Sequence, residues 1–242
     1  MILANVRASL ERDDAQLALR LIAGGSRHEL ERAEQLLRDG GIDALLDDPR
    51  LVAALLSSHL GGRASLPLFW YVVVRRALRS VGEDDRALAD YVAAILLHFG
   101  MRTRAQRISS ADDEVYETLA SLVHSLDEPD ARRNFLVRQH LGNYALWLSG
   151  LFPDLIEYRR WRRGGPDFEY YEDLGRRGFQ LAANHRLAQE HGLSELFQEA
   201  AERFGSLRMA LNGISDALFF PNHNSPDRLM RQVRDEARWR RS

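Results

Sequence analysis

The 242-residue chain contains no cysteine and no lysine. Without cysteine it can form no disulfide, thiolate zinc site, thiol nucleophile or iron–sulfur cluster. Without lysine it can have neither a phosphate-binding loop of the GxxxxGK[ST] type nor a Schiff-base lysine for pyridoxal phosphate. Because all 33 basic residues are arginine, any contact with an anion must use arginine forks, helix N-termini or neutral donors.

Long hydrophobic runs and an excess of one charge are also missing. The formal net charge is −2, so no overall field draws the protein to nucleic acid or to anionic lipid. The longest apolar run, Leu66–Val74, is far shorter than the roughly 20 residues that span a bilayer. The N-terminus shows no signal-peptide pattern. We therefore expect a soluble, cytoplasmic protein without membrane contact.

Metal-binding and catalytic motifs are absent from the sequence. None of the eight histidines follows an acidic residue by three positions, as a carboxylate-bridged di-iron bundle requires. His28-Glu29 lacks the second histidine of the zinc-protease motif. The acidic pairs Asp47-Asp48, Asp84-Asp85 and Asp112-Asp113 fall at predicted helix starts, where carboxylates cap the helix. We expect no metal and no cofactor, assign no catalytic residue, and favour a protein that is not an enzyme.

Helical periodicity runs through the chain, and no alternating strand pattern bounded by hairpin turns interrupts it. Three adjacent valines in Leu66–Val74 would suit a strand, but no turn or partner strand lies nearby. The sequence predicts an all-α protein of about 10–12 helices without β-sheet, arranged as a multi-helix bundle or as packed helical hairpins.

Turn residues predict individual helix boundaries and a division of the chain. Gly40-Gly41 is expected to close one helix and Gly213 to break another. The longest helices are predicted over residues 130–151, 168–191 and 195–211, and Asp227 is expected to cap the last helix. The polar, arginine-containing segment 101–111 is a predicted linker between helical subdomains 1–100 and 112–242, although one continuous domain remains an alternative.

Residues 138–184 hold the most distinctive side chains. His140, Asn143, Tyr144 and Trp147 follow at i, i+3, i+4 and i+7, so they share one stripe of a helix beside an apolar stripe. Tyr170 and Tyr171 on the next long helix could face them. Such groups can line a pocket for a planar or anionic small molecule. The alternative is an ordinary half-buried packing interface.

A basic cluster lies inside the same region, at residues Arg159, Arg160, Trp161, Arg162 and Arg163. Arginines beside an aromatic ring can hold phosphates and stack a base. The alternative is a solvated helix end, where arginines complement the helix dipole and Trp161 packs back onto the core.

These observations favour a non-enzymatic protein-interaction or scaffold module, with a protein partner or a homodimer through an aromatic helical face. The alternative is a small-molecule or nucleotide-binding helical protein with a pocket in residues 138–184, where a small anionic ligand would bind. Nucleic-acid binding through Arg159–Arg163 is a third interpretation, which the slightly negative net charge disfavours.

Overall fold

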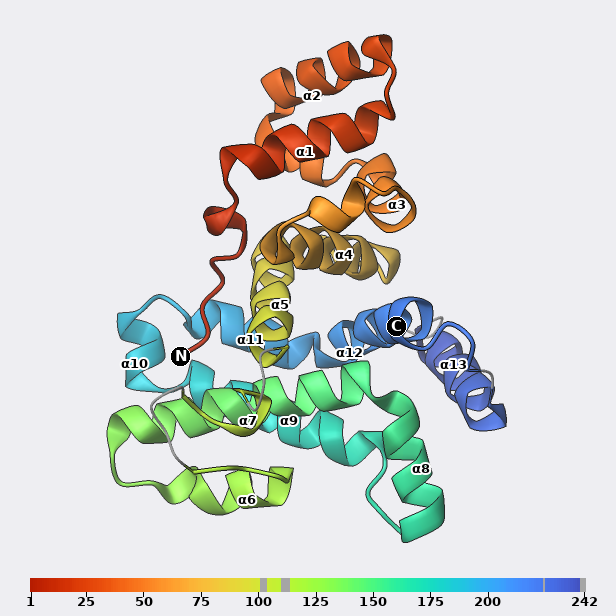
Figure 1. Ribbon diagram of the computed structural model, residues 1–242. Helices are drawn as coiled ribbons and strands as arrows, with labels where there is room; N and C mark the ends of the chain where they lie inside the picture. The colour runs from red at the N-terminus through yellow and green to blue at the C-terminus, as the bar shows by residue number, and fades with distance from the viewer. Residues whose placement is uncertain (101–103, 110–113, 224, 240–242) are drawn as a thin grey trace. The chain divides into compact units, whose positions relative to one another are not determined.

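The computed structural model of the protein describes residues 1–100, 104–109, 114–223 and 225–239. Over these ranges the chain is all-α, with thirteen α-helices and no strand (Figure 1). The predicted fold class is confirmed, and the helices number thirteen rather than 10–12. Among the described helices, none has the length and hydrophobicity that crossing a membrane would require.

The chain divides into two compact units, which are described separately. The N-terminal unit comprises residues 2–97, and the C-terminal unit comprises residues 98–242 together with Met1. Residues 101–103 and 110–111 of the predicted linker, and the predicted cap Asp112-Asp113, lie outside the described residues. The linker therefore stays a prediction.

Five helices make up the N-terminal unit, and α1 and α2 form a hairpin in it (Figure 1). Tyr71, Val74 and Tyr91 lie in its core and are fully buried. Ser65 caps α4 by accepting a hydrogen bond from the backbone N–H of Leu68 at 3.1 Å, so the apolar run is helical as predicted. The helices are α1 (Arg12–Ala23), α2 (Arg27–Leu46), α3 (Pro49–Ser57), α4 (Leu66–Ser80) and α5 (Arg86–Phe99), whose last two residues belong to the other unit.

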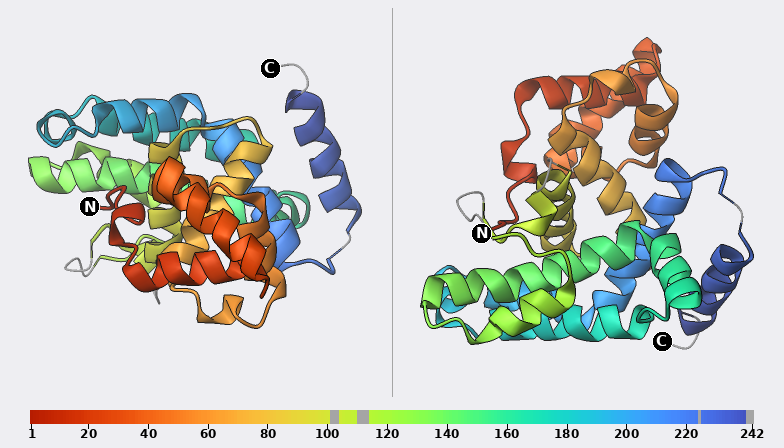
Figure 2. Two further views of the ribbon diagram at one scale, coloured as in Figure 1. Left: turned by 90° about the horizontal axis from the view of Figure 1, so that it is seen from above. Right: turned by 60° about the horizontal axis from the view of Figure 1, so that its bottom comes forward.

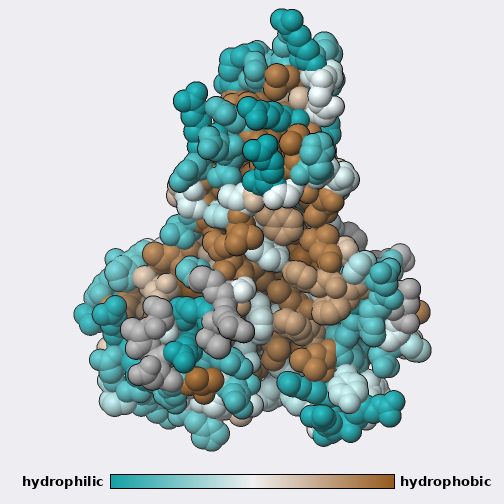
Figure 3. Space-filling view, in the orientation of Figure 1, coloured by the Kyte–Doolittle hydropathy of each residue, from teal (hydrophilic) through white to brown (hydrophobic). Residues whose placement is uncertain are grey.

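The predicted helix end at Gly40-Gly41 coincides with a kink in α2. Gly41 has non-helical backbone angles (φ 68°, ψ −170°), which glycine adopts at little cost, and a second helical segment then runs to Leu46. Exposed ion pairs lie on α2 in the α1–α2 hairpin, including Arg27 with Glu31 at 3.3 Å and Arg32 with Glu29 at 3.1 Å. The surface over α1 and α2 is accordingly mostly hydrophilic (Figure 3).

The C-terminal unit is built around α7 and α9, which run antiparallel side by side (Figure 1). Glycines let their backbones approach closely, since a Cβ added to Gly178 would lie 2.5 Å from the backbone nitrogen of Gly142. Helices α11 and α12 pack against this pair. The helices are α6 (Leu119–His124), α7 (Ala131–Leu151), α8 (Pro153–Arg163), α9 (Phe168–Ala183), α10 (Arg186–Glu190), α11 (Ser194–Glu202), α12 (Phe204–Ile214) and α13 (Pro226–Trp239).

Two long helices predicted in this unit are each divided. The 168–191 helix breaks where His185 caps α10 by accepting a hydrogen bond from the backbone N–H of Leu187 at 3.2 Å. The 195–211 helix breaks at Arg203, between α11 and α12. Gly213 does not end α12, which continues into a π-helical turn at Ser215–Phe219. Side chains and tertiary packing decide these boundaries, because the apolar periodicity continues across them.

Candidate functional site

The predicted stripe on α7 forms a column of aromatic rings. His140 and Tyr144 stack with their centroids 5.9 Å apart, and Tyr144 and Trp147 stack at 5.9 Å. Phe99 lies 5.4 Å from the His140 ring, and Phe152 packs edge-on against Trp147 at 4.8 Å. The structure therefore brings three of the predicted site residues together, and their rings contact one another.

The polar groups of this column are buried and only partly satisfied. Asn143 and Tyr144 are buried, and the Tyr144 hydroxyl donates to the backbone oxygen of Glu117 at 3.3 Å. His140 is 3% exposed, and its Nε2 has no hydrogen-bond partner among the described residues. Burial, together with the positive charge of Arg104, lowers the pKa of His140 to about 3, so the ring is neutral at physiological pH.

Of the two tyrosines predicted to face this stripe, only Tyr171 is buried. The nearby Arg159 side chain acts against burial on the pKa of the Tyr171 hydroxyl, and both Arg159 and Tyr171 act electrostatically on Tyr144. Burial raises the pKa of Tyr144 and of Tyr171. Tyr170 is 37% exposed and touches the edge of the Tyr171 ring. Arg159, Tyr171 and Tyr144 thus converge, whereas Tyr170 lies on the outer side; a ligand pocket between them stays a prediction.

The basic cluster forms the exposed end of α8. Trp161 is 63% exposed, and its Nε1 donates to Glu157 at 2.9 Å, so it does not pack back onto the core. The Arg160 guanidinium lies 5.2 Å from the centre of the Trp161 ring. Arg162 and Arg163 are exposed, and Gly164 ends the helix in a left-handed conformation. The cluster is a solvated helix end with an exposed indole.

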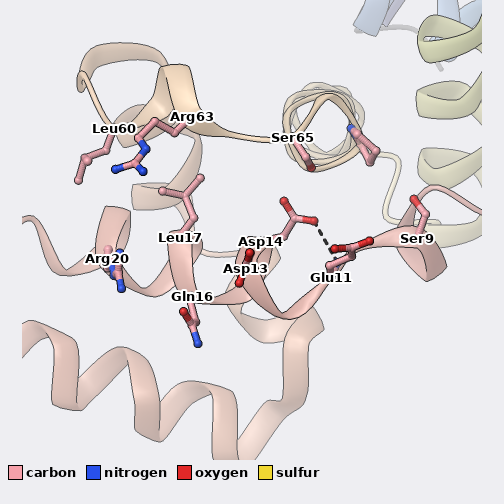
Figure 4. Close-up of a pocket in the computed structure, with 11 residues that line it drawn as sticks. Ser9, Glu11, Asp13, Asp14, Gln16, Leu17, Arg20, Leu60, Arg63 and Ser65 are labelled. Carbon is pink, nitrogen blue, oxygen red and sulfur yellow. Dashed lines mark hydrogen bonds between the residues drawn. The ribbon is translucent and has the colours of Figure 1, made fainter.

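A groove of about 620 Å³ lies in the N-terminal unit, and none of the predicted site residues lines it. Its wall includes Glu11, Asp13 and Asp14 at the start of α1, and Arg63 from the turn before α4 (Figure 4). The Asp14 carboxylate accepts a hydrogen bond from the backbone N–H of Glu11 at 3.0 Å. The Glu11 side chain caps the same helix turn in return, so Glu11 and Asp14 have a structural role.

A buried arginine network that sequence reasoning missed lies under α13. Arg208 on α12 is 1% exposed and donates to Glu172 on α9, to Asn212 and to Asp235 on α13, each at 2.7 Å. Burial alone would lower the pKa of Arg208, but the negative charges of Asp235 and Glu172 and the hydrogen bonds that Arg208 donates to them outweigh this effect and raise it. Asn212 in turn donates to the backbone oxygens of Ser149 and Gly150 at 2.8 Å. The network therefore satisfies carbonyls that the end of α7 leaves unpaired.

Two further arginines fix α13 to the unit. Arg228 is 3% exposed and donates to Asp154 at the start of α8 at 2.7 Å. Arg231 is 2% exposed and donates to both oxygens of Asp216 in the π-helical turn, at 2.7 and 2.9 Å. Three residues further along, Arg234 donates to the buried Glu157 of α8 at 2.8 Å. Helix α13 is thus attached by ion pairs rather than by apolar packing.

The consequence is that α13 turns its apolar side chains outward. Leu229 is 55% exposed, Met230 60% and Val233 61%, and Pro226 and Ala237 on the same face are exposed as well. The ion-paired residues Arg228, Arg231 and Asp235 lie on the opposite side of the helix, and Arg234 lies on the flank of the stripe. An ordinary surface helix has the reverse orientation, with the apolar stripe inward. We call Pro226, Leu229, Met230, Val233 and Ala237 the α13 stripe.

The sequence contains only part of the signal for this arrangement. Apolar residues at 226, 230, 233 and 237 alternate four and three apart, which identifies an amphipathic helix. Periodicity cannot say which face points inward. Ser225, rather than the predicted Asp227, caps the helix by accepting a hydrogen bond from the backbone N–H of Arg228 at 3.1 Å.

Comparisons with known proteins add no assignment. No protein-family model matches this sequence, and no curated protein and no solved structure shows significant similarity to it. Across the part of the chain that the structure describes, no three histidine, aspartate or glutamate side chains are placed to hold a metal ion. The fold and the site define an all-helical protein of two compact units, in which the amphipathic helix α13 turns its apolar face outward.

Proposed function

We propose that the protein is a non-enzymatic, cytoplasmic interaction module and that the α13 stripe is its binding face. The single observation that supports this most directly is the inverted orientation of α13. Soluble proteins seldom expose a continuous apolar face on an ordered helix, and such faces commonly mark protein–protein contacts. A helix that presents apolar side chains three and four apart fits the groove or helix of a partner.

The attachment of α13 supports the same proposal. Leu229, Met230 and Val233 could have been buried against the unit with the helix rotated by half a turn. Instead, the buried arginines and their carboxylates fix the opposite rotation, because a rotated helix would leave Asp216 and Asp154 without Arg231 and Arg228. Buried ion pairs specify geometry through this penalty for breaking them.

Other exposed hydrophobic residues gather on the elements that hold α13. Leu155, Tyr158 and Trp161 on α8 are exposed, as are Phe219 and Phe220 at the end of the π-helical turn. With the three apolar residues of α13, they make up more than half of the large hydrophobic side chains exposed on the described surface. Aromatic residues are enriched at binding surfaces, which favours this region over the hydrophilic hairpin of the N-terminal unit.

Site-specific photo-cross-linking in the producing cell tests the proposal. A photoreactive amino acid at position 233 should give discrete protein adducts, because Val233 belongs to the stripe and is 61% exposed. The matched control is position 66, since Leu66 is 63% exposed but lies on α4. Adducts at 233 that do not exceed those at 66 would contradict the proposed function.

A further inference from the structure

We propose that the occupant of the α13 stripe is α13 of a second copy of this chain, packed antiparallel about a two-fold axis near Met230. This inference rests on the proposed function and names its partner. Two features of the helix support it: the spacing of its apolar residues and the placement of two opposite charges on one flank.

The apolar residues have the spacing of a helix–helix seam. Positions 226, 230, 233 and 237 are separated by four, three and four residues, the alternation that keeps a stripe facing a partner helix. Leu229 widens the stripe beside Met230. The centre of the apolar set 226, 229, 230 and 233 falls between Leu229 and Met230. A two-fold axis there pairs Pro226 with Val233 of the second copy, and Leu229 with its Met230, so these four residues meet apolar residues while Ala237 lies beyond the seam.

The charges on one flank complement each other in the same arrangement. Asp227 and Arg234 lie two turns apart on one side of the stripe, at helical angles that differ by about 20°. In an antiparallel pair that side of one helix meets the same side of the other. Asp227 then lies about 3 Å along the axis from the level of Arg234 of the second copy, within reach of the long arginine side chain, and the contact forms twice. Asp227 is exposed and makes no side-chain hydrogen bond or ion pair within the described chain.

Arg234 can pair with Asp227 of the second copy and keep its ion pair with Glu157. It is about half exposed, at 47%, and holds Glu157 through Nη2 and the Met230 backbone oxygen through Nε. Its Nη1 makes no hydrogen bond within the described part of the chain. A guanidinium carries five donors, so it can bridge Glu157 and a carboxylate of a second copy.

The size of the seam sets the expected strength. A helix of 14 residues is about 21 Å long, so the seam alone falls among the small interfaces typical of transient complexes. The exposed helix lies along the outer edge of the C-terminal unit in both views of Figure 2. We therefore expect a dimer that forms reversibly in the micromolar range.

Cysteine cross-linking of the full-length protein tests the arrangement, and the absence of native cysteine makes each probe unambiguous. Met230→Cys lies near the axis. In an ideal antiparallel pair its two copies therefore have a Cα separation within the range of about 4.4–6.8 Å that a disulfide requires. Ala237→Cys lies in the same stripe but about 20 Å from its symmetry mate. We expect disulfide-linked dimer for Met230→Cys and at least about tenfold less for Ala237→Cys under mild oxidation.

Three other outcomes would overturn this inference. Equal cross-linking at both positions indicates a parallel pair, and no cross-linking at either indicates no pairing of α13. If the adducts formed at position 233 in cells link the chain to a different protein and never to a second copy, the second copy is rejected as the occupant, while the proposed function is upheld. An Asp227→Arg variant separates the charge contribution: it should weaken dimerisation by roughly tenfold at low salt, because it places like charges opposite each other.

Discussion

Helices α7 and α13 belong to the same unit and attach to it by opposite means. Helix α7 is buried on nearly all sides, and residues such as Phe135, Val137 and Leu141 contact its neighbours. Helix α13 turns Arg228 and Arg231 inward and leaves Val233 in solvent. Apolar burial is non-directional, whereas an arginine fork fixes one orientation. The comparison shows how a chain can hold an apolar helix face out of its own core.

The largest expected effect comes from removing the arginine that α12 and α13 share. Arg208→Leu leaves the buried Glu172 and the half-buried Asp235 without their strongest partner, so it should lower the free energy of unfolding by about 3–5 kcal/mol. Equilibrium urea unfolding at neutral pH measures this loss.

Arg176→Leu is the matched control for Arg208→Leu. Arg176 also pairs with Glu172, at 3.0 Å, but its side chain is 38% exposed. Solvent screening limits the contribution of such a pair to about 1 kcal/mol or less. Equal losses in the two variants would show that burial does not distinguish these arginines, and the contrast between the two attachments would fail.

A smaller effect is expected at the close approach that holds α7. In Gly178→Ala the new Cβ would meet the backbone of α7, 2.5 Å from the nitrogen of Gly142, and backbone cannot move aside cheaply. The overpacking should cost about 1–3 kcal/mol of unfolding free energy. Gly205→Ala is the control, because its nearest neighbour is the flexible end of Arg176 at 3.6 Å. That variant should be neutral or up to about 1 kcal/mol more stable, since alanine favours helix.

The pH dependence of stability sharpens the comparison on the α7 side. Burial lowers the pKa of His140 from 6.5 to about 3, so between these values the unfolded chain binds a proton that the folded chain does not. The stability that this group contributes is fully present above pH 6.5 and is lost as the pH falls toward 3. From pH 7 to pH 5 the loss amounts to about 2 kcal/mol.

Denaturation of His140→Gln at both pH values isolates this contribution. The variant cannot titrate at this position, so its stability should fall by about 2 kcal/mol less than that of the native chain over the same interval. His28→Gln is the control for the loss of an imidazole, since the His28 side chain is 75% exposed. If the free energy of unfolding had the same pH dependence in all three proteins, His140 would take up a proton in the folded chain as readily as in the unfolded chain.

The fold was predictable from sequence because amphipathic periodicity and capping residues are local signals. The long helix predicted over residues 130–151 is confirmed as α7 (Ala131–Leu151). Breaks such as the one at Arg203 were not predictable, because apolar periodicity crosses them and tertiary packing decides.

The candidate site was less accessible to sequence reasoning. The spacing of His140, Tyr144 and Trp147 correctly placed three rings on one stripe. The pairing of Arg231 with Asp216, 15 residues away, and of Arg208 with Glu172, 36 residues away, depends on the fold. Without those pairs, the final helix reads as an ordinary amphipathic helix, and its outward orientation stays hidden.

Sedimentation equilibrium of the full-length protein tests the central claim most directly. The account predicts a reversible monomer–dimer equilibrium that Val233→Asp abolishes and Leu66→Asp preserves, because both side chains are about equally exposed and only Val233 lies in the α13 stripe. Val233→Asp should change the free energy of unfolding of the monomer by less than about 0.5 kcal/mol, as is usual for surface positions. A native chain that stays monomeric at every soluble concentration, or a dimer that Val233→Asp leaves intact, would contradict the account.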